Sequence, residues 1–381
     1  MSEGRNYSRR CKKMTIVKES APHLRRKASV TRMMVDVLIA LAPTLIFAFV
    51  VYPLNTLWIF LISLFTMNAC EFAYVGLRNM MPKDNLKHSF KERFTYSYKG
   101  KYKLSNALTA SISAIIFCLI VPAGCPLYAV FLGSLVGITL GKLVFGGLGS
   151  NIFNPAAVGM LFAKICFGNQ YQQVDTWYYT IPDAASGGTP LGVLNGGNLT
   201  NIGDYQLLDL FLGRIPGTLG EVFKITIILG LIYLLIRRSA DYRIVVSYLG
   251  TVAILMLIAG LTIPGVNALH FTAYALLSGG VLFGATFMLT DPVTSPINPP
   301  SRWIYGIVAA IFTVFIRLFA ALPEGVGFSI LLANMIAVFL DHYEWTNPRY
   351  TWKKYLAMGL LLVLSGLTVF LVIKFGGVVN G

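Results

Sequence analysis

Long uncharged apolar runs recur along almost the whole of this 381-residue chain. A helix needs about 17–25 mostly apolar residues to cross the roughly 30 Å hydrocarbon core of a bilayer, and helices satisfy their own backbone hydrogen bonds there. The chain is 56% hydrophobic and 12% charged, whereas an average soluble domain has about 25% charged residues. We therefore predict an all-α polytopic membrane protein.

The apolar runs divide into eleven candidate spans, so we expect about 10–11 transmembrane helices. The spans cover approximately residues 33–51, 56–76, 107–121, 127–145, 155–168, 222–236, 244–261, 270–288, 303–320, 326–340 and 355–375. The spans at 155–168 and 326–340 are short and flanked by Gly, Pro or Asn, which is typical of broken helices that line a buried site.

Basic residues gather in segments that the alternation of spans places on one side of the membrane. They lie before the first span and after the second, sixth and tenth, and include Arg9, Arg10, Lys12, Lys13, Arg78, Lys83, Lys99, Arg237, Arg238, Arg243, Arg349 and Lys353. Because Lys and Arg in short loops stay in the cytoplasm, we expect a multi-pass protein of the cell (inner) membrane with a cytoplasmic N-terminus. These flanks also account for most of the net charge of +15, so no nucleic-acid partner is expected.

The two halves of the chain contain similar segments in the same order. Residues 117–122 resemble residues 287–292, and residues 141–145 resemble residues 316–319. The shift corresponds to five spans, and an odd number inverts the second copy. We therefore predict two inverted five-helix repeats, with binding sites at paired broken helices near the pseudo-two-fold axis, around residues 151–157, 291–300 and 325–334.

The expected organisation has five segments: a cytoplasmic basic arm (1–32), the first membrane repeat (33–168), an extracytoplasmic loop (169–221), the second inverted repeat (222–340), and a cytoplasmic loop with an added C-terminal helix (341–381).

Metal and haem cofactors have little support in the sequence. At most one of His23, His88, His270 and His342 lies in a span, whereas bis-His haem needs two. Cys11, Cys70, Cys118, Cys125 and Cys166 show no CxxC spacing. We predict no metal site within this chain; one Cys contributing to a site shared with another subunit stays open.

One polar motif lies in the predicted extracytoplasmic loop, at Ser186-Gly187-Gly188-Thr189-Pro190-Leu191-Gly192. Gly187 and Gly188 remove side-chain bulk beside the Thr189 hydroxyl, and Pro190 stiffens the backbone that follows. The motif suggests a presented hydroxyl to which a phosphate could be attached. An ordinary surface turn is the alternative, since Gly, Ser and Pro are the usual turn residues.

The segment Ser-Gly-Gly-Thr-Pro-Leu resembles the flavinylation motif, Ser-Gly-Ala-Thr-Pro-Leu or a close variant, of a membrane protein family. That family comprises the D-type component of the Rnf complex, an ion-translocating ferredoxin:NAD oxidoreductase, and the B-type component of the sodium-translocating NADH:quinone oxidoreductase. Gly188 stands where Ala is commoner. The resemblance extends to Asn-Ile-Phe-Asn-Pro-Ala at 151–156 and Thr-Asp-Pro-Val-Thr at 290–294. The short N-terminal arm is more similar to that of the Rnf component.

The resemblance implies a subunit of an ion-translocating oxidoreductase that is not catalytic alone. FMN would be joined to Thr189 by a phosphodiester, within the motif formed by Ser186, Gly187, Gly188 and Pro190, and a riboflavin would bind without a covalent bond. Electrons would pass between ferredoxin and NAD in step with Na⁺ or H⁺ transport. The implied partners are a second flavoprotein subunit, Fe–S subunits, other membrane subunits, and a flavin transferase for maturation.

Asn151 and Asn154 would, by resemblance, contact the riboflavin. Their spacing of three predicts that both amides lie on one face of a helical turn, where they offer donors and acceptors to flavin N and O atoms. Helix capping beside Pro155 is the alternative.

Ionisable residues inside a membrane are costly, so Asp36, Glu71 and Asp291 are candidates for an ion path. Glu71 is expected either in the path or paired with a basic neighbour. Asp291 could cap a half-helix, order the riboflavin loop or handle a cation. Asp36 lies near the expected interface, where a solvated carboxylate is the simpler interpretation.

Three other functions remain open. The chain could be the B-type component of a sodium-translocating quinone reductase, a solute channel or transporter without redox function, or a scaffold protein without flavin. Bound flavin distinguishes the first from the other two.

Overall fold

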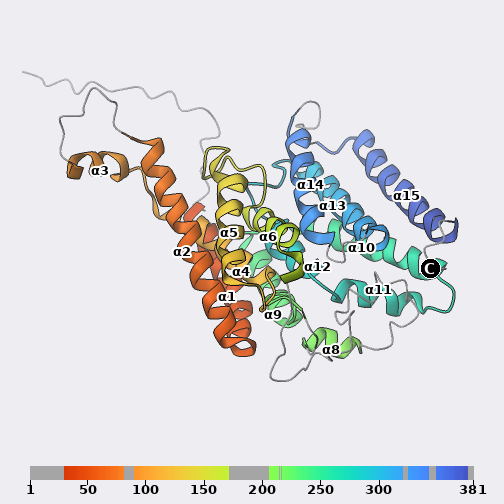
Figure 1. Ribbon diagram of the computed structural model, residues 1–381. Coiled ribbons are helices and arrows are strands. Elements are labelled where there is room, and N and C mark those ends of the chain that lie inside the picture. Colours follow the sequence, from red (N-terminus) through yellow and green to blue (C-terminus); the bar gives the residue numbers. More distant parts are fainter. Residues whose placement is uncertain are drawn as a thin grey trace, which may run out of the picture.

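The computed structural model describes residues 30–80, 90–170, 206–213, 215, 217–320, 325–342 and 349–375. Within these ranges the chain forms helices and no strand (Figure 1). The helices are α1 (Val30–Val51), α2 (Pro53–Arg78), α3 (Phe90–Tyr98), α4 (Leu104–Ile120), α5 (Leu127–Ile138), η2 (Thr139–Leu143), α6 (Pro155–Cys166), η3 (Gly168–Gln170), α8 (Leu207–Leu212), α9 (Lys224–Arg237), α10 (Tyr242–Thr262), α11 (Ala268–Leu277), α12 (Val281–Phe283), η5 (Gly284–Met288), α13 (Pro299–Phe319), α14 (Gly325–Leu340) and α15 (Trp352–Phe375).

The prediction of an all-α polytopic membrane protein is confirmed, because each of the eleven predicted spans overlaps a helix. Among the described residues, five helices are long and apolar enough to cross a membrane: α1, α2, α10, α13 and α15. A sixth span results if α11 and α12–η5 are counted together, and α4, α5–η2, α6 and α14 are apolar but shorter. The inverted repeat stays a prediction.

The predicted span at 270–288 is bent by 61° between α11 and α12. The bend follows Ser278, and Gly279 there has a positive φ of 58°, a conformation that favours glycine. The predicted span at 270–288 is therefore formed by two helical segments rather than by one.

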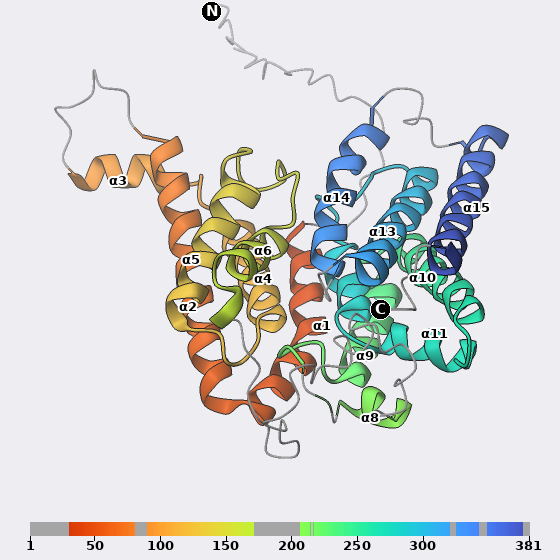
Figure 2. The same ribbon diagram turned by 45° about the vertical axis from the view of Figure 1, so that its right-hand side comes forward.

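Helix α1 runs through the middle of the molecule, between two groups of helices (Figure 2). The first helix group consists of α2, α4, α5 and α6, and the second of α9, α10, α11, α13, α14 and α15. The groups meet where α1 packs on both α4 and α9, and where α6 packs on α14. The interface between the two helix groups is where the candidate site lies.

Glycines bring α5 and α6 into close contact in the first helix group. A Cβ on Gly137 would lie 2.6 Å from the carbonyl oxygen of Pro155, and one on Gly159 would lie 2.5 Å from that of Gly133. Small residues of this kind allow close approach of membrane helices. The contact fixes the N-terminus of α6, which starts at the candidate site.

Candidate functional site

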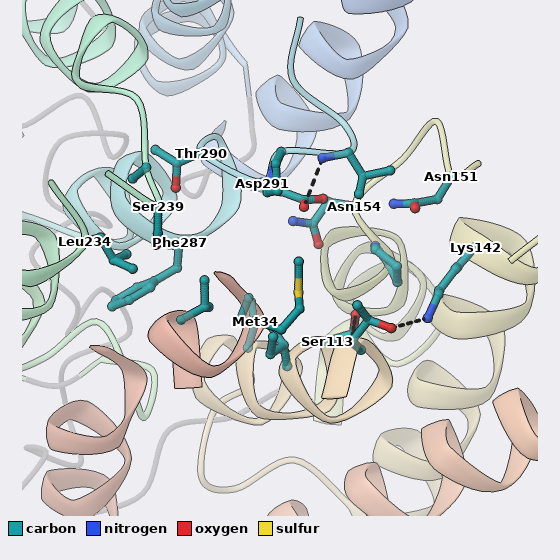
Figure 3. A pocket seen from close by; sticks show the side chains of 18 of the residues that line it. Met34, Ser113, Lys142, Asn151, Asn154, Leu234, Ser239, Phe287, Thr290 and Asp291 are labelled. Carbon is teal, nitrogen blue, oxygen red and sulfur yellow. Dashed lines mark hydrogen bonds between the residues drawn. The ribbon is translucent and has the colours of Figure 1, made fainter. Parts of the chain in front are cut away.

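A pocket lies at the interface of the two helix groups (Figure 3). It encloses about 720 Å³ of empty space, including its open side. Its apolar lining is Met34, Val37, Ile112, Ile116, Leu148, Pro155, Leu234, Ala240, Phe287, Pro292 and Val293, and its polar lining is Thr109, Ser113, Lys142, Asn151, Asn154, Ser239, Thr286, Thr290 and Asp291. The pocket therefore combines apolar walls with several hydrogen-bonding groups.

Asn151, Asn154 and Asp291 come from two segments far apart in the sequence and meet at one edge of the pocket (Figure 3). Each segment follows a short π-helix, η2 in one case and η5 in the other. Short π-helical turns are frequent at functional sites. Both segments are predicted from the sequence as parts of the site, and the structure brings them together.

Asn154 is the N-cap of α6 as well as a pocket residue. Its Oδ1 accepts hydrogen bonds from the backbone N–H of Ala156 at 3.0 Å and of Ala157 at 3.4 Å, and its Nδ2 is 3.5 Å from the carbonyl oxygen of Met288. Pro155 at the first helical position suits this helix start. The capping alternative is thus confirmed, and Asn154 also links α6 to η5.

The expectation that Asn151 and Asn154 share a face of one helical turn is wrong. Helix α6 begins only at Pro155, so both asparagines lie in the loop before it. Asn151 donates to the carbonyl oxygen of Phe153 at 3.3 Å, which folds the loop so that both residues still line the pocket.

Asp291 organises the turn that follows η5. Its carboxylate accepts from the backbone N–H of Val293 at 3.3 Å and from the Thr294 hydroxyl at 3.1 Å. The structural role expected for Asp291 is present, at the pocket's polar edge.

Glu71 is paired with a basic neighbour, one of the two alternatives predicted for it. Its Oε2 is 2.9 Å from Nζ of Lys142, and its Oε1 accepts from Asn106 at 3.0 Å. Glu71 is buried in α2 behind the pocket wall, but Lys142 itself lines the pocket.

The expectation of a solvated carboxylate at Asp36 is wrong. Asp36 is 3% exposed, and it pairs with Arg237 at 3.1 Å and accepts from Ser239 at 2.8 Å. The reason is tertiary: α1 packs against α9, and the last residue of α9 and the segment just after it supply these partners. Asp36 thus ties the central helix to the second helix group.

The predicted flavin motif at Ser186, Gly187, Gly188, Thr189 and Pro190 lies outside the described residues. Among those that are described, no three His, Cys, Asp or Glu side chains are arranged to hold a metal ion.

Lys142 was not predicted as a pocket residue, although the sequence contains a signal for it. A lone Lys lies within the apolar run 127–145, and intramembrane ionisable residues are candidates by default. The predicted ion-path residues were all carboxylates. Lys224 and Arg317 were missed in the same way, and both are buried beside the bend between α11 and α12.

The sequence matches the model of the NQR2, RnfD, RnfE family over residues 17–350, which includes every pocket residue. The chain belongs to this family.

Members of this family with similar sequences include two B subunits of Na⁺-translocating NADH-quinone reductase. The one from Ectopseudomonas mendocina (strain ymp) is 35% identical over 239 residues, which are 61% of this chain and 58% of that protein. The one from Chromohalobacter salexigens is 34% identical over 236 residues, 61% of this chain and 57% of that protein. The match thus spans somewhat more than half the length of these relatives.

Proposed function

We propose that this chain is the flavin-carrying membrane subunit of a redox-driven ion pump of Rnf type. FMN is attached to Thr189 through a phosphodiester, and riboflavin occupies the pocket between the two helix groups. The observation that carries the proposal is the meeting of Asn151, Asn154 and Asp291 in one pocket. Family membership supports the same class of function.

The pocket residues fit a flavin. The ring system is broad and apolar on its faces, which suits walls formed by Met34, Ile112 and Phe287. Its edge carries nitrogen and oxygen atoms, for which amide and hydroxyl side chains offer donors and acceptors. Such side chains stand at Asn151, Asn154 and Thr290.

When bound, the flavin supplies electron transfer, and the protein supplies binding, orientation and electrostatics. The apolar walls exclude water from the ring. Asn154 is held by its capping bonds to α6, so it presents a fixed edge of the pocket. Lys142 provides a positive charge on the same side as Asn151 (Figure 3).

The two ends of the molecule differ in a way that supports the proposed orientation. The end of α2, α3 and the start of α15 lie at one end in Figure 2, and α8 lies at the other. The first end includes Arg78, Lys99, Lys353 and Lys354, and these basic residues favour a cytoplasmic location for that end.

A second flavoprotein subunit and Fe–S subunits would exchange electrons with the two flavins.

A role as the B-type component of a sodium-translocating quinone reductase is the second candidate, because relatives 34–35% identical carry that name. The purified complex distinguishes the two. An Rnf-type complex reduces NAD with reduced ferredoxin, whereas a quinone reductase oxidises NADH with quinone.

The proposal is tested by the flavin that the purified, native chain retains. Acid extraction should release riboflavin in about equal amount to the chain and leave a second, acid-stable flavin on the polypeptide. A colourless chain would contradict the proposal and favour a channel or scaffold without redox function.

A further inference from the structure

Helix α3 lies to the side of the two helix groups, at the end of α2, in both views of the molecule (Figure 1 and Figure 2). It packs against α2, and none of its residues lines the pocket. We call α3 and the turn that follows it, residues 90–103, the surface segment. The segment combines aromatic rings with basic side chains, and the proposed flavin sites do not explain this combination.

Four aromatic rings join the surface segment to the last turns of α2. Phe72 of α2 stacks on Tyr98, with the ring centroids 4.2 Å apart and an angle of 8° between the ring planes. Tyr102 meets Phe72 edge-on at 5.4 Å, and the Phe94 ring lies 4.6 Å from that of Tyr98. Gly76 leaves room for this packing, because a Cβ there would clash with the Tyr98 hydroxyl oxygen. The contacts hold the surface segment across the end of α2.

The part of α2 that meets the surface segment continues an exposed apolar face of a membrane-spanning helix. Leu61 and Phe65 are exposed on that face, and Phe72 follows Phe65 by seven residues, or about two turns. Arg78, the last residue of α2, lies six residues beyond Phe72, which is about 9 Å along the helix axis. The ring cluster is thus at the depth where a membrane helix passes from hydrocarbon to lipid headgroups, where aromatic residues are enriched.

Basic side chains surround these rings. The surface segment contains one acidic residue, Glu92, and five basic residues: Lys91, Arg93, Lys99, Lys101 and Lys103. Three of the lysines are exposed, and the ammonium group of a fourth, Lys101, lies 3.9 Å from the centroid of the Tyr96 ring. Clusters of roughly four to eight basic residues beside a membrane helix attract anionic lipid headgroups.

Water alone would be a poor environment for this part of the molecule. Phe94 and Tyr96 are exposed on α3, and Leu77 and Met80 are exposed at the end of α2. A headgroup layer suits both kinds of side chain, because the apolar groups reach the acyl boundary while the ammonium groups stay at the phosphates.

We propose that the surface segment lies on the membrane and binds anionic phospholipid. The rings of Phe94 and Tyr96 enter the headgroup layer beside α2, and Lys91, Lys99 and Lys103 meet the lipid phosphates. This binding needs no flavin, so its failure would be distinguishable from failure of the proposed function.

The test places a fluorescent label on α3 in the purified complex. Thr95→Cys offers an exposed position for the label, in a background from which the native cysteines have been removed. The complex is reconstituted in phosphatidylcholine nanodiscs, and spin-labelled phosphatidylglycerol or spin-labelled phosphatidylcholine is included in equal amount as the quencher. We expect phosphatidylglycerol to quench the label more strongly, and high salt to reduce this preference because salt screens exposed charges.

Lys91→Gln/Lys99→Gln should lower the preference for phosphatidylglycerol by at least about fivefold, since one lysine near an anionic surface contributes about that much. Lys353→Gln/Lys374→Gln is the matched control. It also removes two exposed lysines, but from α15, which lies on the far side of the molecule from α3 (Figure 2). The control should keep the preference at position 95.

Equal quenching by the two lipids in the complex with unchanged lysines would overturn the inference, and so would an equal loss of preference in the two lysine variants. A label that neither lipid quenches would also overturn it. Quenching by aqueous iodide then separates the two alternatives: a surface segment in water is accessible to iodide, whereas one covered by a partner subunit is not.

Discussion

Asn154 shows at the scale of one residue how a helix start becomes part of a binding site. Its Oδ1 caps α6 and its Nδ2 faces the end of η5. The capping bonds remove rotamer freedom before any ligand arrives, and such preorganisation favours binding.

Asn154→Asp should separate these two roles. Aspartate caps a helix as well as asparagine does, but it lacks the amide donor. Losing one hydrogen bond of about 1 kcal/mol should weaken riboflavin binding by roughly five- to tenfold, and losing the contact of Nδ2 with the Met288 carbonyl should lower the stability of the protein by about 1–3 kcal/mol. Extractable flavin per chain measures the first and thermal unfolding the second.

Asn267→Asp is the control for this change, since Asn267 caps α11 in the same way and does not line the pocket. It should retain wild-type riboflavin. Equal losses in both variants would show that Asn154 acts through folding alone.

The sequence predicted the polar edge of the pocket better than its charges. Asn154 and Asp291 each precede a proline, and Asn151 stands three residues before Asn154, all in segments between apolar runs, so they were visible one at a time. The partners of a buried charge are set by packing between helices. For that reason neither the Asp36–Arg237 pair nor Lys142 as the partner of Glu71 was predicted.

At the scale of elements, the close packing of α5 on α6 positions the pocket loop. Gly137 lies against the backbone of Pro155, the residue that follows Asn154. A side chain at position 137 would push the start of α6 away from α5 and move the asparagine edge.

Gly137→Ala should therefore destabilise the protein by about 1–3 kcal/mol, the usual cost of overpacking, and reduce riboflavin content. Thermal unfolding in detergent and flavin extraction are the measurements.

Gly250→Ala in α10 is the matched control, because a Cβ there meets no atom within 4 Å. It should be neutral or stabilise the protein by up to about 1 kcal/mol, since alanine is the better helix former. A Gly137→Ala protein as stable as the control, with full riboflavin, would show that the contact does not position the site.

The positions of the membrane helices were predictable from apolar runs, but their lengths and bends were not. Helix α6 ends at Cys166, where the run continues, and the 270–288 run bends at Gly279. Residues that face lipid and residues that face a packed protein interior have similar hydropathy, because both are removed from water. Hydropathy therefore does not distinguish a full membrane span from a shorter buried helix.

At the scale of the whole molecule, the proposed orientation puts α3 in the cytoplasm and α8 outside. Single cysteines test it, in a background from which the native cysteines have been removed. Lys99→Cys, just after α3, and Leu208→Cys, in α8, are both on exposed residues. A membrane-impermeant maleimide should label position 99 only in inside-out vesicles and position 208 only in right-side-out vesicles.

Labelling of both positions from one side would contradict this topology and, with it, the expectation that α4, α5 and α6 cross the membrane three times. The inverted repeat, which corresponds to a shift of five spans, also needs these three crossings.

The central claim is that this chain carries a covalent flavin, and in-gel fluorescence of the denatured protein tests it most directly. The chain is co-expressed with a flavin transferase, and its intact mass is measured in parallel. We predict flavin fluorescence and an added FMN mass in the native chain and in Thr180→Ala, which removes another hydroxyl of the segment predicted to be extracytoplasmic, and neither in Thr189→Ala. A native chain without fluorescence and with unmodified mass, or a Thr189→Ala chain that keeps both, would contradict the account.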